Sequence, residues 1–360
     1  MNILVLKPGV RSIDWSLTCA EASRSQAGQM DVAGIDQNLQ ALRAHLAGSR
    51  PEALAVRASC GGTGFRGPVV ADSSSITALA GLVAEAPLHL PVVLSLLEGC
   101  RRVFPGMPTV LFFETAFFSR LPRRESTYGI DNELSESLGL RRQGYHGIYH
   151  EAACAHAIRS TGISPRSARV LSICLEPHPE IVAVLGNRPL MCTSGATPLE
   201  GLPGHTSCGE LDPNIVLMLA RKLGWGPEQI NNALTRQSGL FGLAGCPVML
   251  DDVFAPEAAD LRLARSVLEN RILSACGAGM AAAGGVDAIV FSGRFFTVGK
   301  TLGPWLSARL TFHGGNERRP PRWIGFGEPL DRVIAERAQI VLLESAAGRQ
   351  LTPGWPSSPG

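Results

Sequence analysis

The stretch that decides the fold is NILVLKPGVRSIDWSL, residues 2–17. The apolar run Asn2–Leu6 predicts a short buried strand, Lys7-Pro8-Gly9 predicts a turn, and the alternation over residues 13–17 predicts a returning strand. The stretch RVLSICLEPHPEIVAVL, residues 169–185, repeats this pattern about half a chain later. Two such hairpins predict a duplicated domain.

The rest of the chain alternates helical and strand patterns. Apolar residues recur at helical spacing over 91–103 and 257–283, and each of these segments precedes a buried strand pattern, at 108–113 and 286–291. A further helix is expected over 151–159. A chain of 360 residues is long enough for two cores, because one core rarely grows much past ~250 residues. We therefore predict an α/β protein with two similar sheets facing a cleft.

The expected domain boundaries follow from this duplication. We expect an N-terminal domain over residues 1–150 and a C-terminal domain over residues 151–327, with a segment at about 328–345 that packs back on the first domain. Residues 346–360 are rich in Pro, Gly and Ser, and we expect a disordered tail there.

Composition and charge argue against several classes of protein. The net charge is +2 and the basic residues are scattered, so no nucleic-acid partner is expected. No window reaches ~18 uninterrupted apolar residues, so we expect no membrane span. The first apolar run is too short for the core of a signal peptide. The nine cysteines lack CxxC spacing and are typical of reduced thiols. The sequence therefore predicts a soluble, cytoplasmic protein.

Eight strings stand out along the chain: ILVLKPGVRS at 3–12, VRASCGG at 56–62, APLHLP at 86–91, FFETAFFSRLP at 112–122, RRQGYHGIYH at 141–150, TSGATPLEGLPGHTSCGELDP at 193–213, QSGLFGLAG at 237–245 and GGVDAIVFSG at 284–293. Spread in order over nearly the whole chain, they resemble the acetate kinase family with its propionate and butyrate kinase members.

The resemblance implies the duplicated actin-like fold of sugar kinases and Hsp70 ATPases, with two domains around a central cleft. It also implies an activity, in which ATP, with Mg²⁺, phosphorylates a small carboxylate and yields an acyl phosphate and ADP. A homodimer is implied as well.

Most of the substrate side of the family's site has a match. Arg57 matches the arginine that grips the carboxylate, and a planar guanidinium suits bidentate contact. His89 and His146 match histidines that stabilise the transferring phosphoryl group; the alternatives are a histidine satisfied in a proline turn and a helix-capping residue. Glu114 stands where the family has the aspartate that positions Mg²⁺. Glu328 matches a second magnesium-associated carboxylate, with an exposed loop acid as the alternative.

The acyl pocket of the family has matches too. Leu88, Tyr145 and Pro198 correspond to its apolar walls. Ser59 stands where the family has valine and Tyr145 where it has phenylalanine, so two added hydroxyls predict a preference for a hydroxylated or otherwise more polar acid. Cys60 replaces a family histidine, and both a thiol near the substrate and a packing cysteine remain open.

The phosphate-binding hairpins are rewritten. The family's first hairpin reads Asn-Ala-Gly-Ser-Ser-Ser; here Ser12 remains, Pro8 removes an amide donor, and Lys7 and Arg11 bring positive charge that could meet phosphate. The second hairpin carries a glycine loop in the family and Glu176-Pro177-His178-Pro179-Glu180 here. Its two glutamates are expected to face a phosphate and repel it.

Two further nucleotide segments differ. The arginine that the family carries in Gly-Thr-Arg-Ser-Gly is absent from Thr206-Ser207-Cys208, and the adjacent His205 is a candidate substitute. The adenosine loop, Gly-Ile-Gly-Glu-Asn in the family, begins here at Gly293 and continues with Arg294, Phe295 and Phe296.

Two hypotheses follow. The first is a carboxylate kinase with altered specificity or weak activity, supported by the matches on the substrate side. The second is a degenerate family member that binds a small ligand or partners an active enzyme, supported by the concentration of changes in the nucleotide loops.

Overall fold

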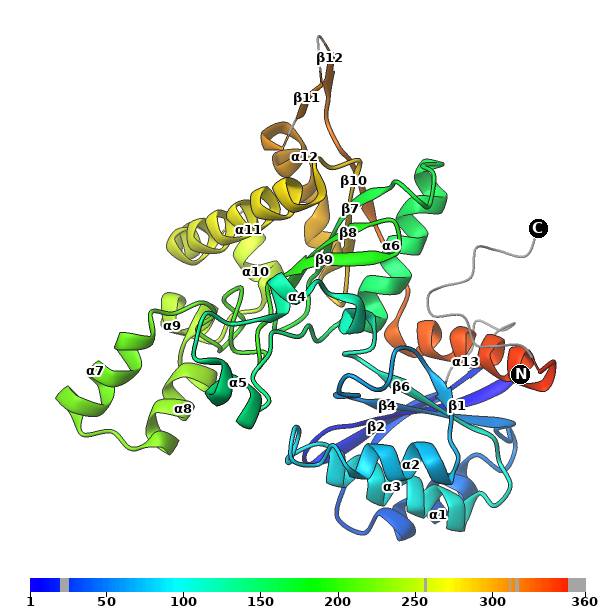
Figure 1. The fold of residues 1–360 in the computed structure, drawn as a ribbon. Helices are drawn as coiled ribbons and strands as arrows, with labels where there is room; N and C mark the ends of the chain where they lie inside the picture. The colour runs from blue at the N-terminus through cyan, green and yellow to red at the C-terminus, as the bar shows by residue number, and fades with distance from the viewer. Residues whose placement is uncertain (20–25, 256–257, 311, 315–316, 349–360) are drawn as a thin grey trace. The chain divides into compact units, whose positions relative to one another are not determined.

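The computed structural model describes residues 1–19, 26–255, 258–310, 312–314 and 317–348. The chain forms two compact units (Figure 1): the first contains Met1–Ser119 and Glu328–Gly360, and the second contains Arg120–Gly327. The expected first boundary, after residue 150, falls inside the second unit. Of the expected tail, Ala346 is the last residue of a helix, and residues 349–360 lie outside the described residues.

The first unit is built on a mixed six-stranded sheet with the order β3-β2-β1-β4-β6-β5. β1 pairs antiparallel with β2, which confirms the first predicted hairpin, and β1, β4 and β6 run parallel. The strands are β1 (Asn2–Pro8), β2 (Ser12–Cys19), β3 (Gln26–Asp31), β4 (Ala53–Ala58), β5 (Val69–Val70) and β6 (Thr109–Phe113).

Helices cover both faces of this sheet. α1 and α3 pack against each other on one face, and α13 contacts β1 and β2 on the other (Figure 1). Because both faces are covered, four consecutive residues of β1, Ile3–Leu6, are fully buried. The helices are α1 (Ile35–His45), α2 (Ser73–Ala80), α3 (Leu90–Val103) and α13 (Leu330–Ala346).

The second unit repeats this plan. Its five-stranded sheet has the order β13-β10-β7-β8-β9, so the antiparallel set β9-β8-β7 corresponds to β3-β2-β1, and the parallel strands β10 and β13 correspond to β4 and β6. The second predicted hairpin and the duplication are therefore confirmed. The strands are β7 (Arg169–Cys174), β8 (Glu180–Leu185), β9 (Arg188–Cys192), β10 (Ala288–Ser292) and β13 (Arg322–Gly325), with a separate ribbon of β11 (Phe312–Gly314) and β12 (Glu317–Arg319).

The second sheet is also covered on both faces: α6 packs on β7 and β10, and α11 packs on β7, β8 and β9 (Figure 1). The α-helices of this unit are α4 (Arg123–Ser126), α5 (Asn132–Ser137), α6 (Gly147–Thr161), α7 (Pro213–Leu223), α8 (Pro227–Arg236), α9 (Gly239–Ala244), α10 (Leu250–Phe254), α11 (Arg262–Ala283) and α12 (Gly299–Arg309). Short 3-10 turns are η1 (Phe117–Arg120), η2 (Ala259–Leu261) and η3 (Phe296–Val298). None of the helices in the described ranges is long and apolar enough to cross a bilayer.

Candidate functional site

The predicted site residues fall into two groups, one in each unit. In the first unit, Arg57 lies near the end of β4 and Glu114 directly follows the neighbouring parallel strand β6. The Arg57 Nε–H donates to the Glu114 carboxylate. The Glu114 side chain is 2% exposed and that of Arg57 is 28% exposed, so the carboxylate is covered while part of the guanidinium faces solvent.

His89 belongs to the same group. It is the residue that precedes α3, and Pro91 occupies the first turn of that helix. Burial lowers the pKa of the His89 imidazole below its ordinary value, and the positive charge of Arg57 lowers it further. Arg57 thus pairs with Glu114 and lies close enough to His89 for its charge to act on the ring, and His89 is favoured in its neutral form.

The strand end that carries Arg57 also positions Ser59 and Cys60. The Ser59 Oγ is buried without a hydrogen-bond partner within the described part of the chain. The Cys60 side chain is buried, and its sulfur accepts the N–H of Gly62 at 3.4 Å. Leu88, expected as a pocket wall, is 67% exposed.

One of the two cationic residues of the first hairpin forms an ion pair within the chain. The Lys7 ammonium forms an ion pair with Asp331 in the first turn of α13. Within the turn, the Gly9 N–H donates to the Ser12 carbonyl at 2.8 Å, and Arg11 is exposed.

Glu328, the other candidate metal ligand, lies at the surface. Its side chain is 47% exposed and contacts Arg332 at 3.4 Å. The described residues include no group of three or more His, Cys, Asp or Glu side chains arranged to hold a metal ion. Mg²⁺ commonly binds one or two protein carboxylates together with substrate phosphates. Glu114 is a single carboxylate of this kind, 2% exposed and paired with Arg57.

In the second unit, His146 immediately precedes α6. Its N–H donates to the Glu180 carboxylate at 2.9 Å, and its Nε2 lies 2.9 Å from the His178 carbonyl. A carbonyl oxygen only accepts, so this ring nitrogen carries the hydrogen. The start of α6 is thus tied to the turn of the second hairpin.

The short loop that follows β9 contains Pro198 and is contacted by Tyr145. The Tyr145 hydroxyl donates to the Ala196 carbonyl at 3.0 Å, and the Ala196 N–H donates to the Tyr128 hydroxyl at 2.7 Å. Pro198 is exposed. The Tyr145 hydroxyl, expected to face a polar acid, therefore has an internal acceptor.

Tyr128, Arg142 and Glu200, whose side chains bind one another at this loop, were not identified from the sequence. The Tyr128 hydroxyl donates to Glu200 at 2.5 Å, and the Arg142 guanidinium pairs with the same carboxylate. Burial raises the pKa of Tyr128 to about 12, with a further contribution from Glu200. Tyr128 and Glu200 are 72 positions apart, so no local pattern could have linked them.

The second hairpin overturns the expectation that its two glutamates face and repel a phosphate. Glu180 is fully buried, where it contacts His150 at 3.3 Å. Glu176 is 9% exposed and accepts the backbone N–H of Arg294 at 2.8 Å and its Nε–H at 2.9 Å. Both carboxylates point into the protein because internal donors and cations bind them there.

Gly293 and His205 lie around the same turn. Gly293 has φ +86, and a Cβ there would approach the Leu175 carbonyl oxygen to 2.6 Å, so close packing on the hairpin requires glycine. The His205 N–H donates to the Pro177 carbonyl at 2.8 Å, and its ring lies 5.1 Å from that of Phe295. Burial lowers the pKa of His205, and Arg294 adds to this effect.

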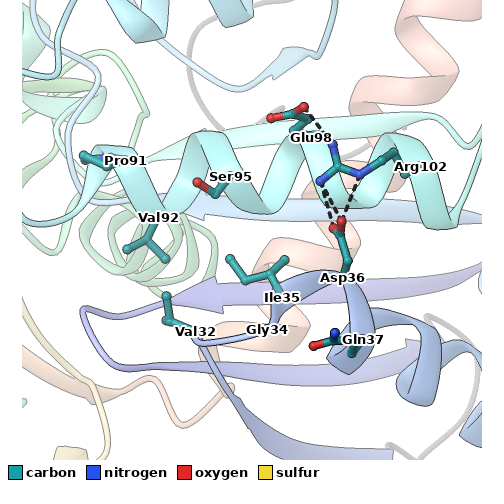
Figure 2. A pocket seen from close by; sticks show the side chains of 10 residues that line it. All are labelled: Val32, Gly34, Ile35, Asp36, Gln37, Pro91, Val92, Ser95, Glu98 and Arg102. Carbon is teal, nitrogen blue, oxygen red and sulfur yellow. Dashed lines mark hydrogen bonds and ion pairs between the residues drawn. The ribbon is translucent and has the colours of Figure 1, made fainter.

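A separate pocket between α1 and α3 is not part of these groups. Figure 2 shows its apolar side chains Val32, Ile35 and Val92, and at one end Arg102, which pairs with Asp36 and Glu98. None of the predicted site residues lines it.

The chain is similar to known proteins in sequence and in fold. The profile of the acetokinase family matches residues 13–299. An acetate kinase of Clavibacter michiganensis subsp. michiganensis is 36% identical over 319 residues, which are 87% of this chain and 78% of that protein. One from Syntrophobacter fumaroxidans is 34% identical over 235 residues, 65% of this chain and 57% of that protein.

Solved structures agree in fold. An acetate kinase of Porphyromonas gingivalis superposes with a TM-score of 0.81 at 22% identity, over 95% of this chain and 99% of the other. A propionate kinase of Francisella tularensis subsp. tularensis gives a TM-score of 0.77 at 23% identity, over 93% and 98% of the two chains.

Proposed function

Because the chain belongs to the acetokinase family, we propose that it is a carboxylate kinase, which transfers the terminal phosphoryl group of ATP to a small carboxylate and forms an acyl phosphate and ADP. Both reactants are anions, so the site needs cations and hydrogen-bond donors that offset their repulsion. The name of the Clavibacter relative, acetate kinase, supports a short acid.

The observation that carries this proposal is the grouping of Arg57, Glu114 and His89 in the first unit. Arg57 is the proposed carboxylate ligand, because its partly exposed guanidinium keeps donors available beside the one given to Glu114. His89, favoured as a neutral imidazole, is the proposed hydrogen-bond donor to the phosphoryl oxygens. His146 is a proposed ligand contact in the second unit through Nδ1, because its Nε2–H is given to the His178 carbonyl.

Mg²⁺, when bound, neutralises charge on the nucleotide phosphates, and Glu114 is the residue proposed to hold it. We place the reaction in the cytoplasm, which supplies ATP. Its reducing conditions also suit the cysteine thiols of the described residues.

An altered substrate preference is proposed on narrower grounds than the sequence suggested. Of the two added hydroxyls, that of Tyr145 donates to Ala196 and that of Ser59 has no acceptor in the described residues. Ser59 alone therefore supports a preference for a polar acid, and a substrate would reach its buried Oγ only after a small local movement.

A second candidate function is ligand binding without phosphoryl transfer. The contacts between Glu176 and Arg294 and between Lys7 and Asp331 favour it, because these two cations of the rewritten loops already bind the chain's own carboxylates. A nucleotide phosphate would have to displace these carboxylates or bind the same cations beside them.

A homodimer is also proposed. None of the residues of α7 is buried, although the helix carries several large apolar side chains, and Leu217, Met218 and Leu223 are about half exposed. Apolar surface of this kind is expected to be covered in an assembly. A second copy of the chain is the proposed cover.

The test is an assay for acyl phosphate with Mg-ATP and a set of acids containing acetate, propionate and their hydroxy acid counterparts, with hydroxylamine as the trap. We expect product with at least one acid, and a loss of about a hundredfold in kcat/KM in Arg57→Ala, the equivalent of ~2.7 kcal/mol. Glu98→Gln, a change of an exposed acid in the same unit, is the matched control.

Nucleotide binding separates the two candidates. A ligand at 100 times its Kd adds ~2.7 kcal/mol of stability, which raises the melting temperature. A shift with Mg-ATP or Mg-ADP and no acyl phosphate from any acid supports binding without transfer. The absence of any shift at millimolar nucleotide contradicts the kinase proposal.

A further inference from the structure

Glu180 and His150 form a pair in the interior of the second unit, and both side chains are fully buried. The His150 Nε2 lies 3.3 Å from a Glu180 carboxylate oxygen, and the His150 Nδ1 lies 2.8 Å from the Ser172 hydroxyl. Burial by itself raises the pKa of Glu180, but His150 and His146 outweigh it and lower that pKa to about 2. Glu180 is therefore a buried anion at neutral pH.

The other contacts of the Glu180 carboxylate lie at the start of α6. Its oxygens accept the N–H of Tyr145 at 3.2 Å and that of His146 at 2.9 Å. The first N–H groups of a helix have no partner within the helix, and a negative charge at this end is favourable. His146 makes no capping bond with its own side chain. Glu180, from the first position of β8, supplies the cap.

The same turn also binds the His146 ring. The Nε2–H donates to the carbonyl of His178, two residues before Glu180 in the β7–β8 turn. His150 lies one helical turn after His146, on the same side of α6. The backbone and the ring of His146 are thus both bound to one turn, which is anchored to α6 through Glu180 and His150.

We propose that Glu180 is a positioning residue, which, with His150 as its buried partner, fixes the start of α6 and so holds the His146 ring in one orientation with hydrogen on Nε2. His146 then presents only Nδ1 to a ligand. The consequence for phosphoryl transfer rests on the proposed function, whereas the orientation of the ring does not.

The first experiment uses the wild-type chain alone. In ¹⁵N-labelled protein, the ring nitrogens of His146, assigned with His146→Gln, are expected to show a protonated Nε2 that exchanges slowly. A ring that averages between its two tautomers overturns the proposal, and this measurement does not depend on any activity.

The second experiment compares Glu180→Gln and Glu180→Asp with Glu210→Gln, an exposed acid of the same unit that pairs with Arg271. Glu180→Gln is expected to release the His146 ring and to lower kcat at least tenfold with KM changed less than twofold. Glu180→Asp is expected to recover part of kcat, and Glu210→Gln to match wild type.

The outcomes separate the two proposals. If the wild-type chain phosphorylates no acid while the His146 ring is fixed and Glu180→Gln releases it, the positioning role stands and the kinase proposal fails. A folded Glu180→Gln protein with wild-type His146 ring signals overturns the positioning role whatever the activity.

Discussion

The guanidinium of Arg57 and the carboxylate of Glu114 form an ion pair across the neighbouring parallel strands β4 and β6. The residue proposed to bind the substrate carboxylate thus already has an internal carboxylate. An incoming acid shares Arg57 with Glu114, and the two anions repel each other across the guanidinium.

Removal of the Glu114 charge is therefore expected to strengthen acid binding. Glu114→Gln keeps the shape of the side chain and an acceptor for Arg57, but it lacks the negative charge. We expect the Kd for acetate or propionate, measured by calorimetry without nucleotide or Mg²⁺, to fall about tenfold, the equivalent of ~1.4 kcal/mol. Activity with Mg-ATP is expected to fall if Glu114 holds the metal.

Glu98→Gln is the control, because this acid is 72% exposed in the same unit and pairs with Arg102. Its acid affinity is expected to equal that of wild type. Weaker acid binding in Glu114→Gln would show that the main effect of Glu114 is to orient Arg57, rather than to compete with the acid for Arg57.

His89 is expected to titrate below its ordinary pKa of 6.5. Between the lowered pKa of the folded chain and the ordinary 6.5 of the unfolded chain, the folded chain binds fewer protons at His89. The stability of the fold therefore rises with pH over this range and is lost as the pH falls below 6.5. The His89 ring protons, followed by NMR and assigned with His89→Asn, measure the pKa. In Arg57→Ala it is expected to rise but to stay below 6.5, since burial is the larger cause. A pKa at or above 6.5 in wild type contradicts this account.

Glu176 is expected to weaken anion binding at the second hairpin. Its carboxylate holds both the backbone N–H and the side chain of Arg294. In Glu176→Gln the Arg294 guanidinium loses its anionic partner, so the affinity for inorganic phosphate or ADP is expected to rise several-fold. Calorimetric titration measures it, with Glu210→Gln as the control. An unchanged affinity would mean that anions do not bind beside Arg294.

The features predicted from sequence are those that local patterns encode. The hairpin formed by β1 and β2 and that formed by β7 and β8 each combine alternating or apolar runs with a proline turn, so adjacent residues determine them. The start of α7 is local too, because the Asp212 carboxylate accepts the N–H of Asn214 two residues later.

The features that sequence reasoning missed depend on distant partners. α6 begins at Gly147 rather than at the expected residue 151, since Glu180 from another strand caps it. The burial of Glu180 was missed for the same reason. The contact between Glu176 and Arg294 joins residues 118 positions apart.

A charge on the exposed apolar side of α7 is expected to disrupt the proposed homodimer. Leu217→Glu and Met218→Glu place a carboxylate where each apolar side chain is 48% exposed, so neither change disturbs a core. Light scattering after gel filtration is expected to show a dimer for wild type and a monomer for the double variant. Lys222→Glu, in the last turn of the same helix, is the matched control. A wild-type monomer, or a dimer in all variants, contradicts the role of α7.

Acid is expected to remove the stabilisation that Glu180 provides. Its pKa is about 2 in the folded chain against an ordinary 4.5, so the carboxylate stabilises the fold fully above 4.5 and progressively less as the pH falls toward 2. At neutral pH, Glu180→Gln leaves His150 without its anionic partner and is expected to cost about 3–5 kcal/mol. In a unit of this size each kcal/mol lowers the melting temperature by about 2–4 °C.

The measurement is the difference in melting temperature between wild type and Glu180→Gln over a series of pH values, with Glu210→Gln as the control. The difference is expected to be largest at neutral pH and to shrink below pH 4.5, because the unfolded wild-type chain then binds a proton at Glu180, whereas the folded chain binds it only as the pH approaches 2. If the difference in melting temperature stays constant down to the lowest pH at which the chain remains folded, Glu180 acts through its shape and hydrogen bonds rather than through its charge.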